Sequence, residues 1–373
     1  MRTLVISDLH LGIHTESDVL SRPGALDRLL ARLDGVQRLV LLGDTIELRG
    51  APARDGLAVA EPVLRAIGDA LGSDGEVLIA PGNHDHALAA GWLDWRGRRE
   101  DPGPLELEQR VAPHHASWIA KRLAGFLSPA TTEIVYPGVW LRDDVYAMHG
   151  HYVDAHTEMP TIERLAAGVM GRIVGAVPER ATPDDYEARL APIYAWIQAA
   201  SQRTVAGRRR PGTGAAVKVW KALEGGRSRR SLRRYALTAP FRLAVLGANR
   251  AGLGPVRGEI SPHALRRAGL KAISEAARRL QLAPEHLIFG HTHRIGMLDG
   301  DEPSEWQTAS GTCLHNAGSW TFETHFMAPG LPRSGPYWPG GAVALDEDGA
   351  PRLERLLDDM SAADFRGPRP ATH

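Results

Sequence analysis

Short apolar runs that each end in a loop carrying Asp, Asn or His recur along this chain. The first three are residues 4–6, 39–42 and 77–80, and stretches with helical apolar spacing separate them. Strands that alternate with helices form parallel sheets through right-handed crossovers, so their carboxyl ends lie at one edge of the sheet. The pattern therefore predicts an α/β fold in which the side chains that follow these strands converge.

The first three loops carry groups that can hold a cation or move a proton. Asp8 and His10 are two residues apart, a spacing that places both side chains on one face of an extended segment. Asp44 follows the second strand in the same way. The third loop adds a neutral oxygen ligand, a proton donor near neutral pH and a carboxylate able to orient it: Asn83, His84 and Asp85.

Two later strands end in further imidazoles. His149 and His151 follow one of them, and His291 and His293 follow the other. Each fragment alone has an ordinary structural explanation, such as a solvated loop or a capping carboxylate. Five such fragments at strand ends, in this order, favour a shared metal site instead.

Cysteine content and charge limit the kinds of site that are possible. Cys313 is the only cysteine among 373 residues, which excludes an intramolecular disulfide and a zinc site built from thiolates. Any metal must therefore be held by oxygen and imidazole. The 44 basic and 44 acidic residues balance, so net charge makes no case for nucleic acid or membrane. The sequence shows neither a signal peptide nor a run of about 18 apolar residues, which predicts a cytoplasmic protein.

A helical, Ala- and Arg-rich insertion, residues 156–284, separates the two parts of this pattern. Within it, residues 201–235 hold eleven basic side chains against the single acid Glu224, enough to attract an anion; a solvated Arg-rich face is the alternative. Residues 236–248 are apolar, as expected of the insertion's own core or of a surface for an acyl chain or membrane. The predicted divisions are 1–155, 156–284, 285–360 and a flexible tail, 361–373.

Together the motifs DLH, GD, GNHD, HG and GHTH resemble those of the calcineurin-like metallophosphoesterase superfamily, over about residues 1–155 and 285–325. The resemblance implies a four-layer αββα sandwich with a helical cap, and an enzyme that hydrolyses a phosphoester or pyrophosphate bond. It also implies two divalent cations, with manganese favoured and iron or zinc as alternatives. The implied partner is a small anionic phosphorylated substrate, and no stable protein partner is implied.

The superfamily's ligand set has a matching residue in every motif of this chain. One cation would be held by Asp8, His10 and His293, the other by Asn83, His149 and His291, and Asp44 would bridge them. Two cations that share a carboxylate lie roughly 3.5–4 Å apart, where a bridging water loses a proton near neutral pH and attacks phosphorus.

The resemblance also suggests roles outside the coordination sphere. His84 would stabilise developing charge or protonate the leaving oxygen, with Asp85 as its partner. His151, Glu47 and His315 are the predicted substrate-side residues.

Within the superfamily, Glu47 and the long basic insertion look most like the UDP-2,3-diacylglucosamine pyrophosphatase branch, where a helical cap receives a nucleotide-lipid pyrophosphate. The chain departs from that branch at His84, where Arg is common, and at His151, where Asp is common. The cap's general role and a lipid or membrane contact through it are therefore expectations, but the lipid substrate is not carried over.

Two alternatives remain open. A nuclease or a cyclic nucleotide phosphodiesterase is the first, because members of the superfamily that cut DNA share the Asp-x-His-Leu-Gly opening, and the Arg-rich residues would then bind the strand backbone. A scaffold without turnover is the remote second, because such proteins usually show eroded ligands and every ligand is present here.

Overall fold

The computed structural model describes residues 1–13, 15–50, 52–158, 173–202, 262–323 and 335–366, together with residues 168, 170 and 250. The chain forms two compact units, of which the first contains Met1–His151, Tyr194–Arg203 and Ala283–His373, and the second contains Tyr152–Ile193 and Thr204–Leu282. The basic residues 203–235, the apolar residues 236–248 and the end of the predicted tail, 367–373, lie outside the described residues.

The first unit is built on strands that form two connected sheets. In spatial order the first sheet contains β11 (Arg352–Arg355), β10 (Gly341–Leu345), β1 (Thr3–Ile6), β2 (Arg38–Leu42), β3 (Glu76–Ala80), the first part of β5 (Thr131–Arg142) and β4 (Glu108–Val111). The second contains the rest of β5, then β6 (Val145–Met148), β7 (His286–Phe289), β9 (Cys313–Ala317) and β8 (Ile295–Gly296). Strand β5 belongs to both, because residues 131–134 pair with β3 and residues 138–142 pair with β6.

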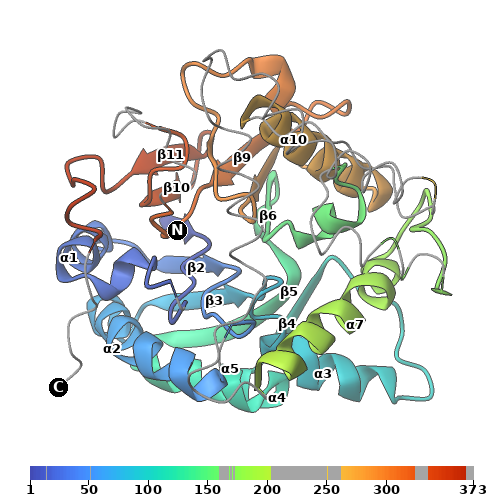
Figure 1. Cartoon of the computed structure of the whole chain (residues 1–373), viewed down its shortest axis with the longest axis horizontal. Coiled ribbons are helices and arrows are strands. Elements are labelled where there is room, and N and C mark those ends of the chain that lie inside the picture. The colour runs from blue at the N-terminus through green and yellow to red at the C-terminus, as the bar shows by residue number, and fades with distance from the viewer. Residues whose placement is uncertain are drawn as a thin grey trace, which may run out of the picture. The chain divides into compact units, whose positions relative to one another are not determined.

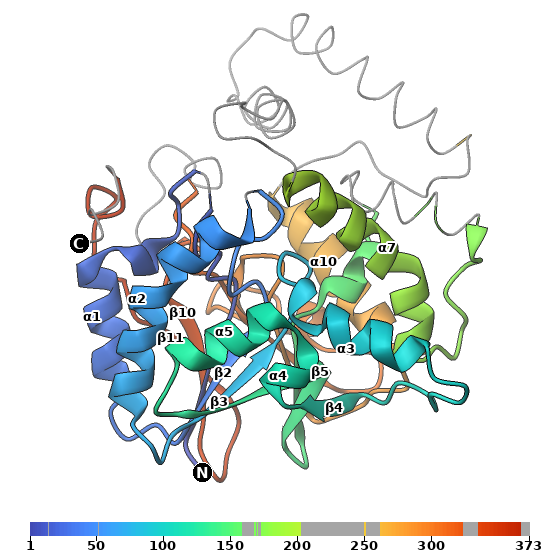
Figure 2. The ribbon, with the colours of Figure 1, turned by 90° about the horizontal axis from the view of Figure 1, so that it is seen from below.

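Helices cover one face of the first sheet, as Figures 1 and 2 show from two directions. They are α1 (Pro23–Arg32), α2 (Ala53–Leu71), α3 (Ala87–Gly97), α4 (Pro113–Ala116) and α5 (Trp118–Phe126). Along β1, Leu4 and Ile6 belong to the core under these helices, whereas Val5 belongs to the core between the two sheets. Because successive residues of a strand face opposite sides, strands buried on both faces must be apolar throughout. The predicted α/β sandwich is confirmed.

Two helices of the predicted insertion are described, α7 (Pro183–Gln202) and α10 (Pro262–Arg279). The last residues of α7 belong to the first unit. Ser201 Oγ donates to the carbonyl oxygen of Leu48 at 2.9 Å, and Gln202 Oε1 accepts from the amide of Ala53 at 3.0 Å. These hydrogen bonds therefore hold this end of α7 against the segment that follows β2.

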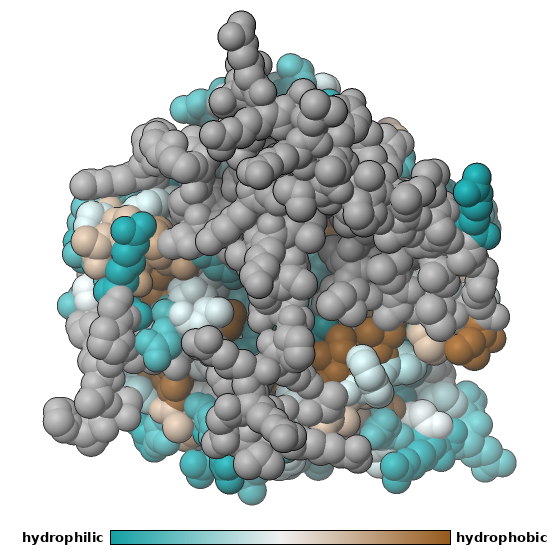
Figure 3. All heavy atoms as spheres, viewed as in Figure 1, coloured by the Kyte–Doolittle hydropathy of each residue, from teal (hydrophilic) through white to brown (hydrophobic). Residues whose placement is uncertain are grey.

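The remaining described elements are short 3-10 helices, η1 (Val19–Ser21), η2 (His151–Ala155) and η3 (Pro303–Trp306). Among the described helices, none is long and apolar enough to cross a membrane. Figure 3 shows hydrophilic and hydrophobic residues interspersed over the described part of one face. Large exposed apolar side chains on the first unit include Trp95, Trp118 and Trp196.

Candidate metal centre

The loops after β1, β2, β3, β6 and β7 bring the seven predicted ligands together at the carboxyl edge of these strands. Two groups have ligand atoms within 4.8 Å of one another, Asp8 with His10 and His293, and Asp44 with His149 and His291. Asp44 links the groups, because its Oδ2 lies 3.6 Å from His10 Nε2 and 3.4 Å from His149 Nε2.

The first group has the geometry of a cation site. His10 Nε2 and His293 Nε2 lie 3.2 Å apart, and Asp8 Oδ1 lies 3.8 Å and 3.3 Å from them. Two imidazole nitrogens on one tetrahedral zinc ion are about 3.3 Å apart. Asp8 Oδ1 is buried and has no hydrogen-bond donor among the described residues, whereas Oδ2 accepts from Ser7 Oγ at 2.6 Å and from the amide of His291 at 2.9 Å. A divalent cation bound here would satisfy that buried oxygen.

The second group adds the Asn83 carboxamide. One end of this amide lies 3.3 Å from His149 Nε2, 3.2 Å from His291 Nδ1 and 3.1 Å from Asp44 Oδ2. Its other end lies 2.7 Å from Arg49 Nη1. Asn83, His149, His291 and Asp44 therefore converge with the mixed oxygen and nitrogen atoms that suit manganese, iron or zinc.

Neighbouring groups orient the imidazoles so that one nitrogen of each faces the cluster. His149 Nδ1 donates to the carbonyl oxygen of Leu42 at 2.9 Å, and His293 Nδ1 lies 3.3 Å from Thr321 Oγ1. Such contacts fix the tautomer and ring direction of metal-binding histidines. Burial lowers the pKa of His149, but the charges of Asp44 and Asp8 outweigh it and raise the pKa to about 9. The cluster thus attracts positive charge.

The backbone of five ligands lies in the left-handed region. The φ angles are 56° at Asp8, 46° at His10, 51° at Asp44, 64° at His291 and 57° at His293. This region costs an L-residue roughly 1–2 kcal/mol, and such strain concentrates at functional sites where the surrounding fold maintains it.

Glycines precede Asp44 and His291 because the site has no room for a side chain there. A Cβ at Gly43, where φ is 84°, would lie 2.2 Å from the ring of His149. A Cβ at Gly290 would lie 1.9 Å from Ser7 Oγ and 2.5 Å from Asp8 Oδ2. The glycines of the GD and GHTH motifs are therefore required by the close approach of ligands from other strands.

His84 lies beside the first group and outside it. Its Nδ1 is 2.7 Å from Glu47 Oε2, its amide donates to Asp44 Oδ1 at 2.7 Å, and its ring centroid is 4.6 Å from that of His10. The side chain is 28% exposed. Because Glu47 holds Nδ1, Nε2 is the nitrogen that can face a substrate.

The prediction that Glu47 is a substrate-side residue does not fit its place in the fold. Its carboxylate is buried behind His84, and Oε1 accepts from the amides of Arg49 and Gly50 at 2.6 Å and 2.9 Å. Burial raises the pKa of Glu47, but His84 and His10 hold it well below its usual value. Glu47 is an ionised group that orients these two imidazoles.

The prediction that Asp85 is the partner of His84 is wrong, because the carboxylate turns back toward backbone. It accepts from the amides of Gly82 at 2.7 Å, Thr45 at 2.7 Å and Asp44 at 3.2 Å. Burial and the charge of Asp44 raise its pKa to about 6, against the effect of these backbone donors. Through these backbone amides, Asp85 joins the loops after β2 and β3.

His151 is buried beside His149 and His315 lies away from the predicted ligands, so neither position favours the predicted substrate-side role. His151 is fully buried, its ring packs against those of His149 and Tyr136 at 5.7 Å and 6.3 Å, and burial holds its pKa well below the usual value. His315 Nε2 lies 3.1 Å from His286 Nδ1 at the start of β7, the edge opposite the metal ligands.

The next residue along β9, Asn316, serves the site instead. Its Nδ2 donates to the carbonyl oxygen of Gly290 at 3.1 Å and to Thr292 Oγ1 at 2.8 Å, which holds the GHTH loop. Ser7, Thr321 and Asn316 were not predicted as site residues. Only Ser7 carried a usable signal, its place directly before Asp8.

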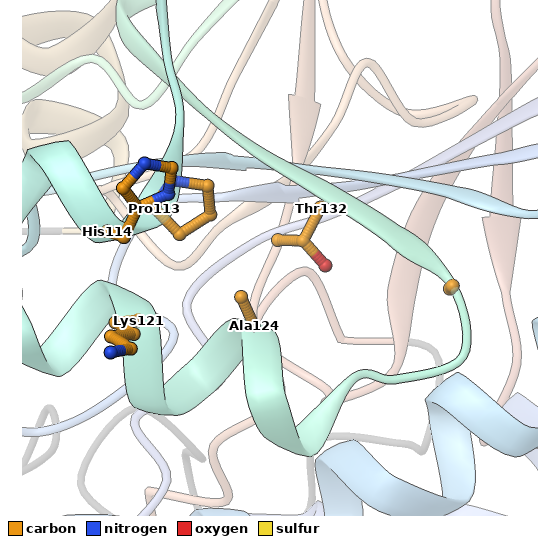
Figure 4. A pocket seen from close by; sticks show the side chains of 6 residues that line it. Pro113, His114, Lys121, Ala124 and Thr132 are labelled. Atoms are coloured by element: carbon orange, nitrogen blue, oxygen red, sulfur yellow. The ribbon is translucent and has the colours of Figure 1, made fainter.

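The hollow shown in Figure 4 is separate from this cluster. It measures about 420 Å³ and is lined by Pro113, His114, Lys121, Ala124, Ala130 and Thr132. Thr132 pairs with Val77 near the start of β3, so the hollow lies toward the edge opposite the ligands. None of the predicted site residues lines it.

The comparisons with known proteins agree with this geometry. A family model described as "Calcineurin-like phosphoesterase" matches residues 1–171, which include every predicted ligand except His291 and His293. No curated protein matches the chain. Residues 1–171 therefore match the calcineurin-like phosphoesterase family, whose members are metal-dependent phosphoric ester hydrolases, and His291 and His293 complete the predicted ligand cluster beyond this match.

Proposed function

We propose that this enzyme binds two divalent cations, with manganese favoured, and hydrolyses a phosphoester or pyrophosphate bond of a substrate held at these cations. The observation that carries the proposal is the bridging place of Asp44, whose Oδ2 lies within 3.6 Å of imidazole nitrogens from both ligand groups. One carboxylate shared in this way is the arrangement of two-metal hydrolytic sites.

The proposed ligands follow from the two groups. Asp8, His10 and His293 hold one cation, Asn83, His149 and His291 hold the other, and Asp44 contributes to both. When bound, the cations lower the pKa of a water molecule and neutralise phosphoryl oxygens.

His84 is the proposed acid. Glu47 accepts from Nδ1 and fixes the ring, and in the doubly protonated imidazolium Nε2 can donate a hydrogen bond to a phosphoryl oxygen or a proton to the leaving oxygen. The short hydrogen bond from the amide of His84 to Asp44 Oδ1 couples the position of this acid to that of the bridging carboxylate.

The proposed substrate is a small anionic phosphorylated molecule, with a nucleotide-lipid pyrophosphate as one form of it. The basic residues of the insertion support an anion, although they lie outside the described residues. Nucleic acids and cyclic nucleotides are outcomes that the substrate test separates.

The test is manganese-supplemented turnover against a phosphomonoester, a phosphodiester, a cyclic nucleotide, a nucleotide-sugar lipid and single-stranded DNA. We expect Asp44→Ala to lose turnover and bound metal together. His84→Ala should keep its metal and lose roughly 10²–10⁴-fold in turnover, the usual contribution of a general acid. Full turnover by Asp44→Ala, or loss of metal from His84→Ala, would contradict the assigned roles.

A further inference from the structure

Arg49 is held in a fixed place beside the metal ligands. Its side chain is only 8% exposed, and its guanidinium lies over the ring of Tyr194, 5.9 Å from the centroid. Its amide donates to Glu47 Oε1, and the preceding carbonyl of Leu48 accepts from Ser201 at the end of α7. The contacts with Tyr194, Glu47 and Ser201 thus keep the guanidinium near Asn83.

The Asn83 carboxamide lies between two surroundings with opposite requirements. At 2.7 Å from Arg49 Nη1, its outer end faces a group that only donates hydrogen bonds. Its inner end faces Asp44 Oδ2 at 3.1 Å, an oxygen that only accepts hydrogen bonds.

Only one orientation of the amide suits each state of the site. Without a cation, the oxygen at the outer end accepts from Arg49 and the NH2 group at the inner end donates to Asp44. A cation needs the oxygen at the inner end, because an amide nitrogen is not a metal ligand. Asn83 must then turn over, which places its NH2 group against the guanidinium, donor to donor.

We propose that Arg49 competes with the second cation for the Asn83 side-chain oxygen, and that a phosphoryl group of the substrate ends this competition. The inference rests on the proposed two-cation function. Once Asn83 has turned, its NH2 group and Arg49 both present donors to the same space. An anionic oxygen placed between them accepts from both, so Arg49 changes from a competitor of the cation into a ligand of the substrate.

The two ligands are therefore linked. An anion that needs the turned Asn83 raises the affinity of the site for the second cation. The cation raises the affinity for the anion by the same factor. The experiment titrates Mn²⁺ into the chelator-treated full-length chain, with and without saturating inorganic phosphate, and follows free Mn²⁺ by electron paramagnetic resonance. The variant is Arg49→Met, which keeps an unbranched side-chain stem and removes the charge and the donors.

We expect the weaker of two Mn²⁺ dissociation constants to fall about tenfold in Arg49→Met without phosphate, comparable with losing one charge-assisted hydrogen bond. Phosphate should tighten the same cation about tenfold in the wild type and much less in the variant. Arg49→Lys, which keeps the charge, should bind this cation closer to the wild-type affinity.

Arg38→Met is the matched control, because it removes an equal charge at the start of β2, where Arg38 pairs with Glu76. This control should bind both cations like the wild type. If the wild type binds two Mn²⁺ ions and Arg49→Met binds them with unchanged or weaker affinity, the inference is overturned while the proposed function stands. A wild type that binds fewer than two ions would overturn both.

Discussion

The pairing of His84 with Glu47 is the contact that decides which atom of His84 can act on a substrate. It joins residues 37 positions apart and lies beside the metal ligand His10. Because Glu47 is buried and also accepts from two backbone amides, its carboxylate cannot easily be replaced by water.

Glu47→Gln should lower turnover roughly 10–100-fold while the protein stays folded, the range seen when groups that orient metal-site residues are changed. The neutral amide weakens the hydrogen bond to His84 and places an NH2 group near backbone donors. Steady-state kinetics with a phosphodiester, beside Glu76→Gln at the opposite edge of the sheet, measures the effect. Equal turnover by wild type and Glu47→Gln would remove Glu47 from the mechanism.

At this scale the sequence predicted which residues gather but not which pairs they form. The seven predicted ligands lie in one region of the structure, because each follows a strand end. Asp85 was paired with its neighbour His84, yet the carboxylate contacts the backbone of the loop that carries Asp44. Contacts between distant loops, such as His84 with Glu47, depend on side-chain directions that no local pattern specifies.

Strands β7 and β9 place two imidazoles against each other away from the metal ligands. His315 Nε2 and His286 Nδ1 are 3.1 Å apart, and burial together with His286 lowers the pKa of His315 to about 4. An imidazole with a lowered pKa stays neutral in the fold but takes up a proton when unfolded. Stability should therefore fall as the pH drops from about 6.5 to 4, by at most about 3 kcal/mol from this residue.

His315→Gln removes the titrating group and keeps a hydrogen-bonding side chain. The free energy of unfolding, measured with urea at pH 7 and pH 4.5, should fall less between these two values in the variant than in the wild type. Metal content at pH 7 should stay unchanged, since His315 lies at the opposite edge from the ligands. An identical loss in both proteins would show that His315 does not cause the acid sensitivity.

Elements were predictable where burial gives a simple pattern. Strands β1, β2, β3 and β7 are apolar on both faces and were found from composition alone. The course of β5 through both sheets was not predictable, because the run contains Pro137 and Gly138 and its pattern predicts two short strands. The return of α7 to the first unit depends on hydrogen bonds from Ser201 and Gln202 to a distant loop.

For the molecule as a whole, the ligands come from both ends of the sequence, from Asp8 to His293, and the insertion lies between them in sequence. The family match ends at residue 171, and His291 and His293 lie beyond it in the GHTH motif. The sandwich was therefore predictable from the strand ends. The substrate was not predictable, because the motifs specify metal ligands and no motif specifies the molecule that binds to them.

The proposed mechanism depends on the claim that two cations share Asp44. Anomalous diffraction at the manganese edge, from crystals of the full chain grown with Mn²⁺, tests it most directly. We predict two peaks roughly 3.5–4 Å apart, with Asp44 between them, His293 on one and His291 on the other. A single peak, or two peaks without Asp44 in common, would contradict the account.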